Sequence, residues 1–385
     1  MIATANRLGK VEEYYFSKKL RQIAELNSQG YDILNLGIGS PDRMPAKSVV
    51  TKLGTEALKD NVHGYQSYKG IPQLRKAFAD WYVKYFDVTL NPETDILPLI
   101  GSKEGIFHIS MTYLNPGDEV LVPNPGYPSY GATAELAGAV TRSYDLVESR
   151  NWQPDLDALA KTDLSKVKIM WVNYPNMPTG AQADLAFFNH LIDFAQKHDI
   201  LICNDNPYAF ILNEHPRSLL AIGLSDHVIE LNSLSKSHNM AGWRMGMVAA
   251  TKGHIDNILR FKSNLDSGMF LPTQLAAVEA LSQDKEWYAS VNSEYRERRI
   301  IAGEILQTLG CLYDQNQVGM FLWARIPDTI ENVEPWVDDI MLSAKVFLTP
   351  GFIFGSNGQR FIRISLCSSQ DTFKEALLRV KNYVS

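Results

Sequence analysis

The sequence predicts an α/β protein whose main part is a mostly parallel β-sheet with helices on both faces. Short apolar runs recur between residues 96 and 248, and amphipathic stretches with helical spacing separate several of them. Buried parallel strands have this nearly continuous apolar pattern, whereas strands with one solvated face alternate apolar and polar residues. After Pro272 the pattern changes to a long helix-like region followed by shorter strands, which indicates a second, smaller α+β part.

Six apolar runs are the expected strands of the main sheet, and each has the length of an ordinary strand. Between the third and the fourth run, Leu185, Phe188, Leu191, Ile192 and Ala195 follow one another at mostly three- and four-residue spacings, which predicts an amphipathic helix. In chain order, the six runs are 96–100, 119–122, 168–172, 200–203, 228–231 and 245–248.

The C-terminal part is expected to begin with a long helix, because an apolar stripe continues at a helical period after residue 285. The stripe consists of Tyr288, Val291, Tyr295, Arg298, Ala302, Ile305 and Leu309. The runs 321–324, 346–348 and 361–365 are expected to be strands, and a second amphipathic helix closes the chain.

The composition is that of an ordinary globular protein and disfavours several classes of partner. Of the 385 residues, 45% are hydrophobic and 21% are charged, and the length suggests two domains or one large domain with an appendage. The net charge of -6 disfavours nucleic acid or an anionic membrane as a partner. No apolar run reaches the roughly 18 residues of a membrane span, and the N-terminal residues lack the apolar core of a signal peptide.

The cysteines and histidines indicate neither a disulfide framework nor a metal site. Cys203, Cys311 and Cys367 are widely spaced and lack the spacing of metal ligands, which favours a reducing compartment. The eight histidines include no closely spaced pair of metal ligands. We therefore expect no metal and a cytoplasmic location.

The segment from Ser233 to Lys236, with Arg244 eight residues further on, carries the strongest functional signal. A lysine can form an imine with an aldehyde, an arginine can grip a phosphate through two parallel hydrogen bonds, and a serine can add a third donor. Pyridoxal phosphate is the common cofactor that carries both an aldehyde and a phosphate. The alternative is a solvated loop, since most lysines lie at the surface. The apolar run 228–231 argues against it, because binding loops of α/β proteins follow the ends of buried strands.

A second candidate anion site follows the first expected strand, in the segment from Gly101 to Gly105. Its glycine allows a tight turn, and the helix that begins there directs the amides of Ser102 and Lys103 toward an anion. The alternative is an ordinary helix start, because serine often caps helices.

Together these segments resemble the class I and II aminotransferases, which are pyridoxal-phosphate enzymes of fold type I, and the resemblance extends over nearly the whole chain. It implies a mainly parallel seven-stranded sheet flanked by helices, with a smaller α+β domain. The large cofactor domain is expected at residues 45–280, and the small domain at residues 1–44 together with 281–385. The resemblance also implies that Lys236 holds the cofactor as an imine and that Ser233 and Arg244 bind its phosphate.

The same resemblance assigns three residues to the cofactor ring. Tyr127 is expected to stack on the ring, Asp205 to hold the proton of the ring nitrogen, and Tyr208 to donate to the ring oxygen. The alternatives are a turn tyrosine that packs over the core and an aspartate that merely begins a turn.

The chain departs from the family at the position directly before Pro-Thr-Gly, where an asparagine usually contacts the ring oxygen. Met177 stands there, and a thioether cannot donate a hydrogen bond. Either Asn176 or Asn173 is expected to supply the contact, or the contact is missing, which would raise the pKa of the imine.

The substrate's α-carboxylate is expected to bind Arg363, which lies inside an apolar strand pattern where an unpaired arginine would cost stability. The segment 36–42 resembles the family's N-terminal substrate loop, with Ile38 and Gly39 in contact with the substrate. Its Gly-Ile-Gly lacks the third glycine of a dinucleotide-binding fingerprint.

Tyr65 resembles the tyrosine that family members lend to the neighbouring subunit's phosphate, which implies a homodimer with shared active sites; local packing is the alternative.

The expected activity is transfer of an amino group from an L-amino acid to a 2-oxo acid, with 2-oxoglutarate as the expected acceptor, by a ping-pong cycle through the Lys236 imine. A pyridoxal-phosphate-dependent C–S β-lyase is the alternative, and a non-catalytic effector-binding module is a remote one, because the chain has no room for an added DNA-binding unit before the substrate loop. The side-chain specificity stays open. Second cations for dicarboxylic substrates would be Lys18, Arg21 or Arg43. An apolar pocket would instead involve Tyr14, Tyr15, Phe352 or Phe354.

Overall fold

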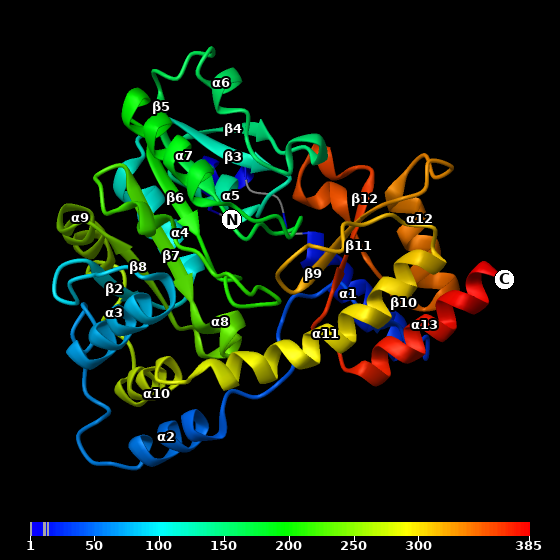
Figure 1. Ribbon diagram of the computed structural model, residues 1–385, viewed down its shortest axis with the longest axis horizontal. Coiled ribbons are helices and arrows are strands. Elements are labelled where there is room, and N and C mark those ends of the chain that lie inside the picture. The colour runs from blue at the N-terminus through cyan, green and yellow to red at the C-terminus, as the bar shows by residue number, and fades with distance from the viewer. Residues whose placement is uncertain (1, 11–12, 14) are drawn as a thin grey trace.

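The computed structural model describes residues 2–10, 13 and 15–385. It contains a seven-stranded sheet with helices on both faces and, beside it, a smaller unit with a three-stranded sheet (Figure 1). We call the first the large unit and the second the small unit. The candidate site lies where the two units meet.

The large sheet has the strand order β2-β8-β7-β6-β5-β3-β4. All neighbouring strands are parallel except β8, which pairs antiparallel with both β2 and β7. The expectation of a mainly parallel seven-stranded sheet is therefore confirmed. The strands are β2 (Ile96–Leu99), β3 (Glu119–Asn124), β4 (Val140–Asp145), β5 (Val167–Val172), β6 (Leu201–Asp205), β7 (Val228–Ser233) and β8 (Gly246–Ala250).

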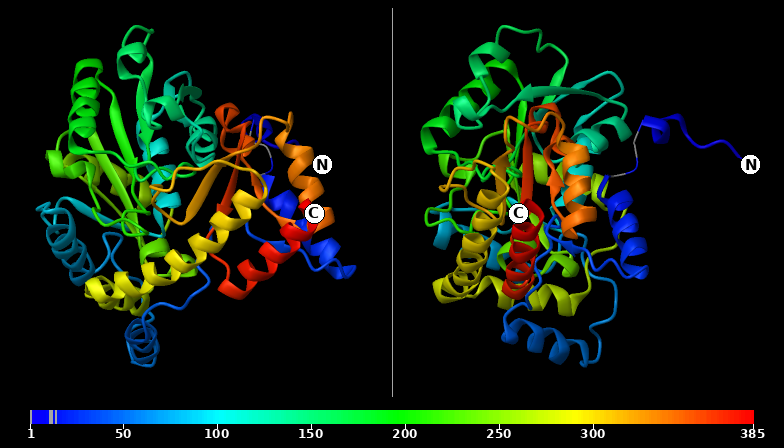
Figure 2. Two further views of the ribbon diagram at one scale, coloured as in Figure 1. Left: turned by 45° about the vertical axis from the view of Figure 1, so that its right-hand side comes forward. Right: turned by 90° about the vertical axis from the view of Figure 1, so that its right-hand side faces the viewer.

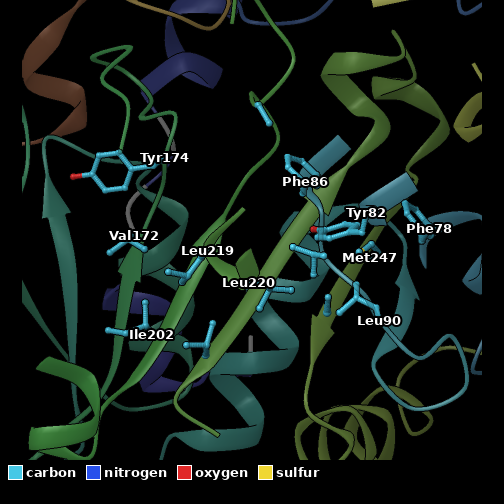
Figure 3. Close-up of a cluster of buried hydrophobic side chains, with 14 of the residues drawn as sticks. Phe78, Tyr82, Phe86, Leu90, Val172, Tyr174, Ile202, Leu219, Leu220 and Met247 are labelled. Carbon is cyan, nitrogen blue, oxygen red and sulfur yellow. The ribbon is translucent and has the colours of Figure 1, made fainter. Parts of the chain in front are cut away.

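Helices cover both faces of this sheet because each strand directs apolar side chains to either side. One face packs against α3 (Pro72–Phe86), α7 (Leu185–His198) and α10 (Leu271–Leu281). Figure 3 shows part of this cluster, with Phe78 and Tyr82 of α3 close to Met247 of β8. The other face packs against α4, α5 and α9, which span Ser102–Tyr113, Ser129–Leu136 and Lys252–Lys262. Outside both layers, α2 (Lys47–Ala57) packs on α10.

The helix α7 shows how the local sequence sets an element's limits. The side chain of Asp184 caps its start by accepting a hydrogen bond from the amide of Phe187 at 2.7 Å. Asp199 ends it in the left-handed conformation, with a φ of 53°. Four of the five predicted apolar positions are buried, whereas Leu185, in the first turn, is 46% exposed.

The small unit combines the two ends of the chain. Its sheet has the order β11-β12-β9 and is antiparallel, and β1 near the N-terminus pairs in parallel with β10. The strands are β1 (Leu34–Asn35), β9 (Phe321–Arg325), β10 (Val346–Phe347), β11 (Thr349–Pro350) and β12 (Phe361–Ser365). The helices of the small unit are α1 (Tyr15–Ser28), α11 (Lys285–Thr308), α12 (Val333–Asp339) and α13 (Gln370–Val384). Two further short helices, α6 (Leu156–Leu159) and α8 (Leu234–Ser237), belong to the large unit.

The long helix α11 connects the two units. All seven residues of its predicted apolar stripe are buried. Tyr288, near its start, packs into the core of the large unit, whereas Val291 and later stripe residues pack into the core of the small unit. In the small unit it lies beside α13, the red helix of Figures 1 and 2. The division into domains near residues 45 and 280 stays a prediction. Among the described residues, no helix is both long and apolar enough to cross a lipid bilayer.

Candidate active site

A cavity of about 340 Å³ lies at the carboxyl ends of β6 and β7, where the large unit faces the small one. In parallel α/β sheets this edge is the usual place for ligands. The cavity brings together side chains from widely separated segments, including most residues that the sequence predicted for a site. The predicted residues that line it are Ile38, Gly39, Ser102, Lys103, Tyr127, Asp205, Tyr208, Ser233, Lys236, Arg244 and Arg363.

Lys236 lies on the single-turn helix α8, which begins directly after β7. Ser233 caps this helix, and its hydroxyl accepts a hydrogen bond from the amide of Ser235 at 3.1 Å. The Lys236 ammonium donates to the carbonyl oxygen of Gly39 at 2.5 Å. Burial lowers the pKa of Lys236, and the nearby cations Arg363 and Arg244 lower it further. A lower pKa leaves more of the amine neutral, which is the form that attacks a carbonyl or accepts a proton.

The start of α4 and Arg244 lie close together in the cavity that Ser233 also lines, and they could hold an anion there. Gly101 precedes the helix with a φ of +80°, a conformation that favours glycine. A Cβ at this position would lie 2.3 Å from a guanidinium nitrogen of Arg244, so the absence of a side chain lets Arg244 approach the helix start. The unpaired amides of the first turn and the helix dipole both favour a negative charge there.

Asp205 ends β6 and is a buried residue of the cavity lining. Its Oδ2 accepts a hydrogen bond from the Tyr130 hydroxyl at 3.0 Å, whereas its Oδ1 has no hydrogen-bond partner among the described residues. Burial raises the pKa of Asp205 to about 7, although the hydrogen bond from Tyr130 opposes this shift. A buried carboxylate oxygen without a donor suits a protonated nitrogen of a bound ring.

Two tyrosines flank the space between Lys236 and Asp205. Tyr127 is half-buried, and its ring lies edge-on to Tyr130 at a centroid distance of 5.6 Å. Tyr208 packs edge-on against Phe321 at 5.8 Å. Burial raises the pKa of Tyr208, so its hydroxyl stays neutral and able to donate a hydrogen bond.

Asn176 is not among the residues that line the cavity, and its contact with the cofactor stays a prediction. Its side-chain Oδ1 accepts from the amide and the hydroxyl of Thr179, and its buried Nδ2 has no hydrogen-bond partner among the described residues. Asn173 does line the cavity, but its amide already donates to the backbone oxygen of Asp205 at 2.5 Å. Met177 occupies the cavity wall, and its sulfur lies 3.2 Å from the Arg363 Nη1.

Arg363 lies on β12 with only 4% of its surface exposed. The carbon of its guanidinium is 4.0 Å from the ring centroid of Phe321 and 4.6 Å from that of Phe354. Its Nη2 donates to the carbonyl oxygen of Gly37 at 2.8 Å. A guanidinium in such low-polarity surroundings is a strong receptor for a carboxylate.

The substrate loop 36–42 is fixed to both sides of the cavity. A Cβ at Gly39 would lie 2.4 Å from the ring of Phe321, so only glycine allows the loop to lie this deep. At its end, both carboxylate oxygens of Asp42 accept from Arg298, at 2.7 and 2.9 Å. Arg298 also donates to the carbonyl oxygen of Leu366, just beyond β12.

Of the other candidates named from the sequence, Asn173 and Phe354 also line the cavity, and the rest of those that the structure describes do not. Tyr65 is 94% exposed and does not reach the cavity of its own chain, so its role toward a partner subunit stays a prediction. Arg21 pairs with Glu13, and Arg43 with Glu294. Lys18, Arg21, Arg43, Tyr15 and Phe352 do not line the cavity, and Tyr14 lies outside the described residues.

Three residues of the cavity wall were not predicted from the sequence. Phe16 and Leu20 of α1 and Phe321 of β9 all line the cavity. The spacing of Phe16 and Leu20 places them on one helix face, but nothing in the sequence alone indicates that this face meets β9.

One group of potential metal ligands lies behind α4, where Glu104, His108 and Asp266 place ligand atoms within 4.8 Å of one another. The buried Lys262 ammonium already contacts both oxygens of Asp266. Since an ammonium compensates this carboxylate, the group is better described as a buried ionic cluster than as a metal site.

Comparisons with known proteins place this geometry among aminotransferases. A sequence profile described as aminotransferase class I and II matches residues 31–380. The LL-diaminopimelate aminotransferase of Dehalococcoides mccartyi strain BAV1 is 39% identical over 382 residues, which cover 98% of each chain. The enzyme of the same name from Aquifex aeolicus is 38% identical over 386 residues, which cover 99% of each chain.

Solved structures agree with the sequence comparisons. BacF from Bacillus subtilis superposes with a TM-score of 0.94 at 35% identity and covers 100% of this chain and 99% of its own. An aromatic aminotransferase from Pyrococcus horikoshii superposes with a TM-score of 0.85 at 27% identity and covers 94% and 98%.

Proposed function

The chain belongs to the class I and II aminotransferases, and from this premise we propose that its cavity binds pyridoxal 5′-phosphate and transfers the amino group of an L-amino acid to a 2-oxo acid, with 2-oxoglutarate as the acceptor. The observation that carries the proposal is that Asp205 of β6, Lys236 after β7 and Arg363 of β12 all line one cavity. An amine, a carboxylate and a guanidinium are the three groups that this reaction requires of a protein.

The residues present fit the cofactor. The amides at the start of α4, Ser233 and Arg244 suit its phosphate, and the unpartnered Oδ1 of Asp205 suits its ring nitrogen. Tyr127 would lie against the ring, and Tyr208 would donate to the ring oxygen. When bound, the cofactor supplies an electron sink that stabilises negative charge on the α-carbon of the amino acid joined to it.

Each residue of the chain then has a defined task. Lys236 would hold the cofactor, and its neutral amine would take the proton from the α-carbon of the bound amino acid and give a proton back in the second half of the transfer. Its lowered pKa favours this neutral form. Arg363 binds the α-carboxylate and so holds the α-carbon in reach of Lys236, which provides most of the advantage of proximity. Over the full cycle an amino group and a carbonyl oxygen exchange places between two acids.

The homodimer also belongs to this proposal. Tyr65 is a highly exposed tyrosine outside its own cavity, as expected for a residue that completes the site of a partner subunit. No observation favours the β-lyase alternative, and each of the similar proteins cited above that is named for an activity is an aminotransferase.

The test is a comparison of Lys236→Ala with the wild-type protein, both loaded with pyridoxal 5′-phosphate. The wild-type protein should show visible cofactor absorbance that amino donors bleach, and it should form L-glutamate from 2-oxoglutarate. Lys236→Ala should lose both properties, whereas Lys197→Ala, an exposed lysine on α7, should keep them. Amino transfer by Lys236→Ala, or release of pyruvate from cystathionine without an acceptor, would contradict the proposal.

A further inference from the structure

We propose that the amino donor of this site has a large apolar side chain, aliphatic or aromatic. The inference rests on the proposed aminotransferase function and names the class of substrate for the same cavity. It follows from the wall that surrounds Arg363, from the exposure of two residues on α1 and from the scarcity of charge in the rest of the lining.

The wall around the carboxylate receptor is apolar. Apart from the residues assigned to the cofactor and Arg363 itself, the large side chains of the lining are mostly hydrocarbon or thioether. Those that carry the argument are Phe16, Leu20, Ile38, Met177, Phe321 and Phe354. They come from α1, the substrate loop, the segment after β5, β9 and the segment before β12. A wall assembled from five separate segments is a property of the cavity rather than of one local sequence.

Phe16 and Leu20 are not simply core residues. They lie four positions apart on α1 and therefore share a helix face. Leu20 is 38% exposed and Phe16 is half-buried, and both border the cavity. Apolar surface that remains exposed beside a binding cavity is the kind that a ligand covers, because its removal from water is favourable.

The position of Arg363 directs the substrate's carbon chain toward this wall. Its guanidinium lies within 5.5 Å of the ring centroids of Phe16, Phe321 and Phe354. A carboxylate that pairs with this guanidinium brings its own Cα and side chain into the same apolar surroundings. Carbon atoms gain from that contact, whereas a second charge would lose its hydration there.

The lining offers little to a second charged group. Among the described lining residues, Asp205 is the single carboxylate, and its free oxygen suits the cofactor ring. A distal ammonium would therefore find no acidic partner in this chain's own lining. Lys103 is the cation left without an assigned side-chain role, but its side chain is exposed, and ion pairs in water contribute little.

The inference is tested most directly by comparing apolar donors with the amino acid after which the similar enzymes are named. LL-diaminopimelate, after which the Dehalococcoides and Aquifex enzymes are named, carries a second ammonium and a second carboxylate. It is therefore the competing donor against which apolar donors are to be measured.

The experiment measures bleaching of the cofactor absorbance by single donors in the loaded dimer. L-Phenylalanine and L-leucine should react with kcat/KM values at least about tenfold above those of LL-diaminopimelate and L-aspartate. Binding without turnover gives an independent readout by calorimetry, because 3-phenylpropanoate carries one carboxylate and an apolar end while glutarate carries two carboxylates. 3-Phenylpropanoate should bind at least about tenfold more tightly.

A pair of matched variants tests the wall itself. Leu20→Ser should lower kcat/KM for L-phenylalanine by about tenfold and leave the absorbance spectrum of the loaded enzyme unchanged. Leu378→Ser is the control, because Leu378 is also a largely exposed leucine on a helix but lies on α13, away from the cavity. It should react with every donor as the wild-type protein does.

The outcomes separate this inference from the function on which it rests. If LL-diaminopimelate or L-aspartate reacts faster than both apolar donors, the inference is overturned and the aminotransferase proposal stands. Equal effects of Leu20→Ser on L-phenylalanine and on L-aspartate would likewise overturn it. If no donor bleaches the absorbance, both the function and the inference are wrong.

Discussion

Burial acts in opposite directions on the two ionisable residues at the centre of the cavity. It raises the pKa of Asp205 to about 7 and lowers the pKa of Lys236, so each residue is driven toward its uncharged form. In the ligand-free protein this is a cost, because both groups ionise readily in water. A bound cofactor offers each of them a partner, so the same burial that costs stability prepares the site for its ligand.

Asp205 therefore predicts a pH dependence of folding. Its pKa is about 4 in an unfolded chain and about 7 in the fold, so between these values the unfolded chain has released a proton that the fold retains. The ligand-free protein should lose stability as pH rises through this window. Asp205→Asn should lack this loss and gain roughly 2–3 kcal/mol over the wild-type protein between about pH 5 and pH 7.5. Urea unfolding at both pH values measures the free energy of unfolding of each protein. If that free energy changes equally with pH in both proteins, the raised pKa of Asp205 is contradicted.

At this scale most of the charged and polar residues predicted from the sequence line one cavity, because they belong to short motifs in which chemistry dictates residue type. Asn176 shows the limit of that reasoning, because its position next to Met177 does not tell which way its side chain points. Its Oδ1 accepts from Thr179, whereas its buried Nδ2 has no hydrogen-bond partner among the described residues. Which way a loop side chain points depends on hydrogen bonds that spacing does not encode.

At the scale of elements, the substrate loop is held by an ion pair remote from the reacting atoms. Arg298 of α11 binds Asp42 with two hydrogen bonds and also binds the backbone beyond β12, the strand that carries Arg363. It thereby ties the loop to the strand that carries Arg363, the proposed receptor of the substrate's carboxylate.

Asp42→Asn should therefore raise the KM of amino donors about three- to tenfold, because the weakened tie leaves the loop less ordered. The affinity for pyridoxal 5′-phosphate should stay unchanged, since Asp42 lies away from the phosphate and ring contacts. Asp32→Asn, which breaks a comparable pair with Arg379 far from the cavity, is the control. Steady-state kinetics and cofactor titration separate the two effects; a loss of cofactor affinity alone would contradict this role.

The elements themselves were largely predictable, and the exception in the large sheet has a physical cause. All six expected strands of the large sheet and all three of the small unit are strands. The two-residue strands β1 and β11 of the small unit were missed, and so was β4. It lies at the edge of the sheet, and most of its residues are exposed or half-buried, so its sequence lacks the apolar run of a buried strand.

At the scale of the whole molecule, the proposed dimer makes a quantitative prediction. If Tyr65 contributes to the partner's site, each site takes Lys236 from one chain and Tyr65 from the other. Lys236→Ala and Tyr65→Ala then remove residues that different chains supply to that site. Mixing the two variants under exchange should restore about a quarter of the wild-type activity, because half of the dimers are hybrids and each hybrid has one intact site. Activity assays with sedimentation measure this; if mixing restores nothing while hybrids form, Tyr65 does not act across the interface.

One part of the cavity wall was not predicted from the sequence, whereas Ile38 and Phe354 were already candidates. Phe16, Leu20 and Phe321 are unremarkable apolar residues in their own segments. They become a binding surface only because α1 and β9 meet, and such long-range contacts follow from the packing of the two units rather than from any local pattern.

The pairing of β1 with β10 also bears on how the protein is made. The ribosome releases Leu34 and Asn35 long before Val346 and Phe347, their partners in the sheet. During synthesis the emerging N-terminal segment must wait, with its apolar residues unshielded, while some three hundred further amino acids are added, a situation in which newly made chains depend on chaperones. A nascent chain stalled before residue 346 should therefore remain protease-sensitive over its first forty residues, even after the large sheet has formed.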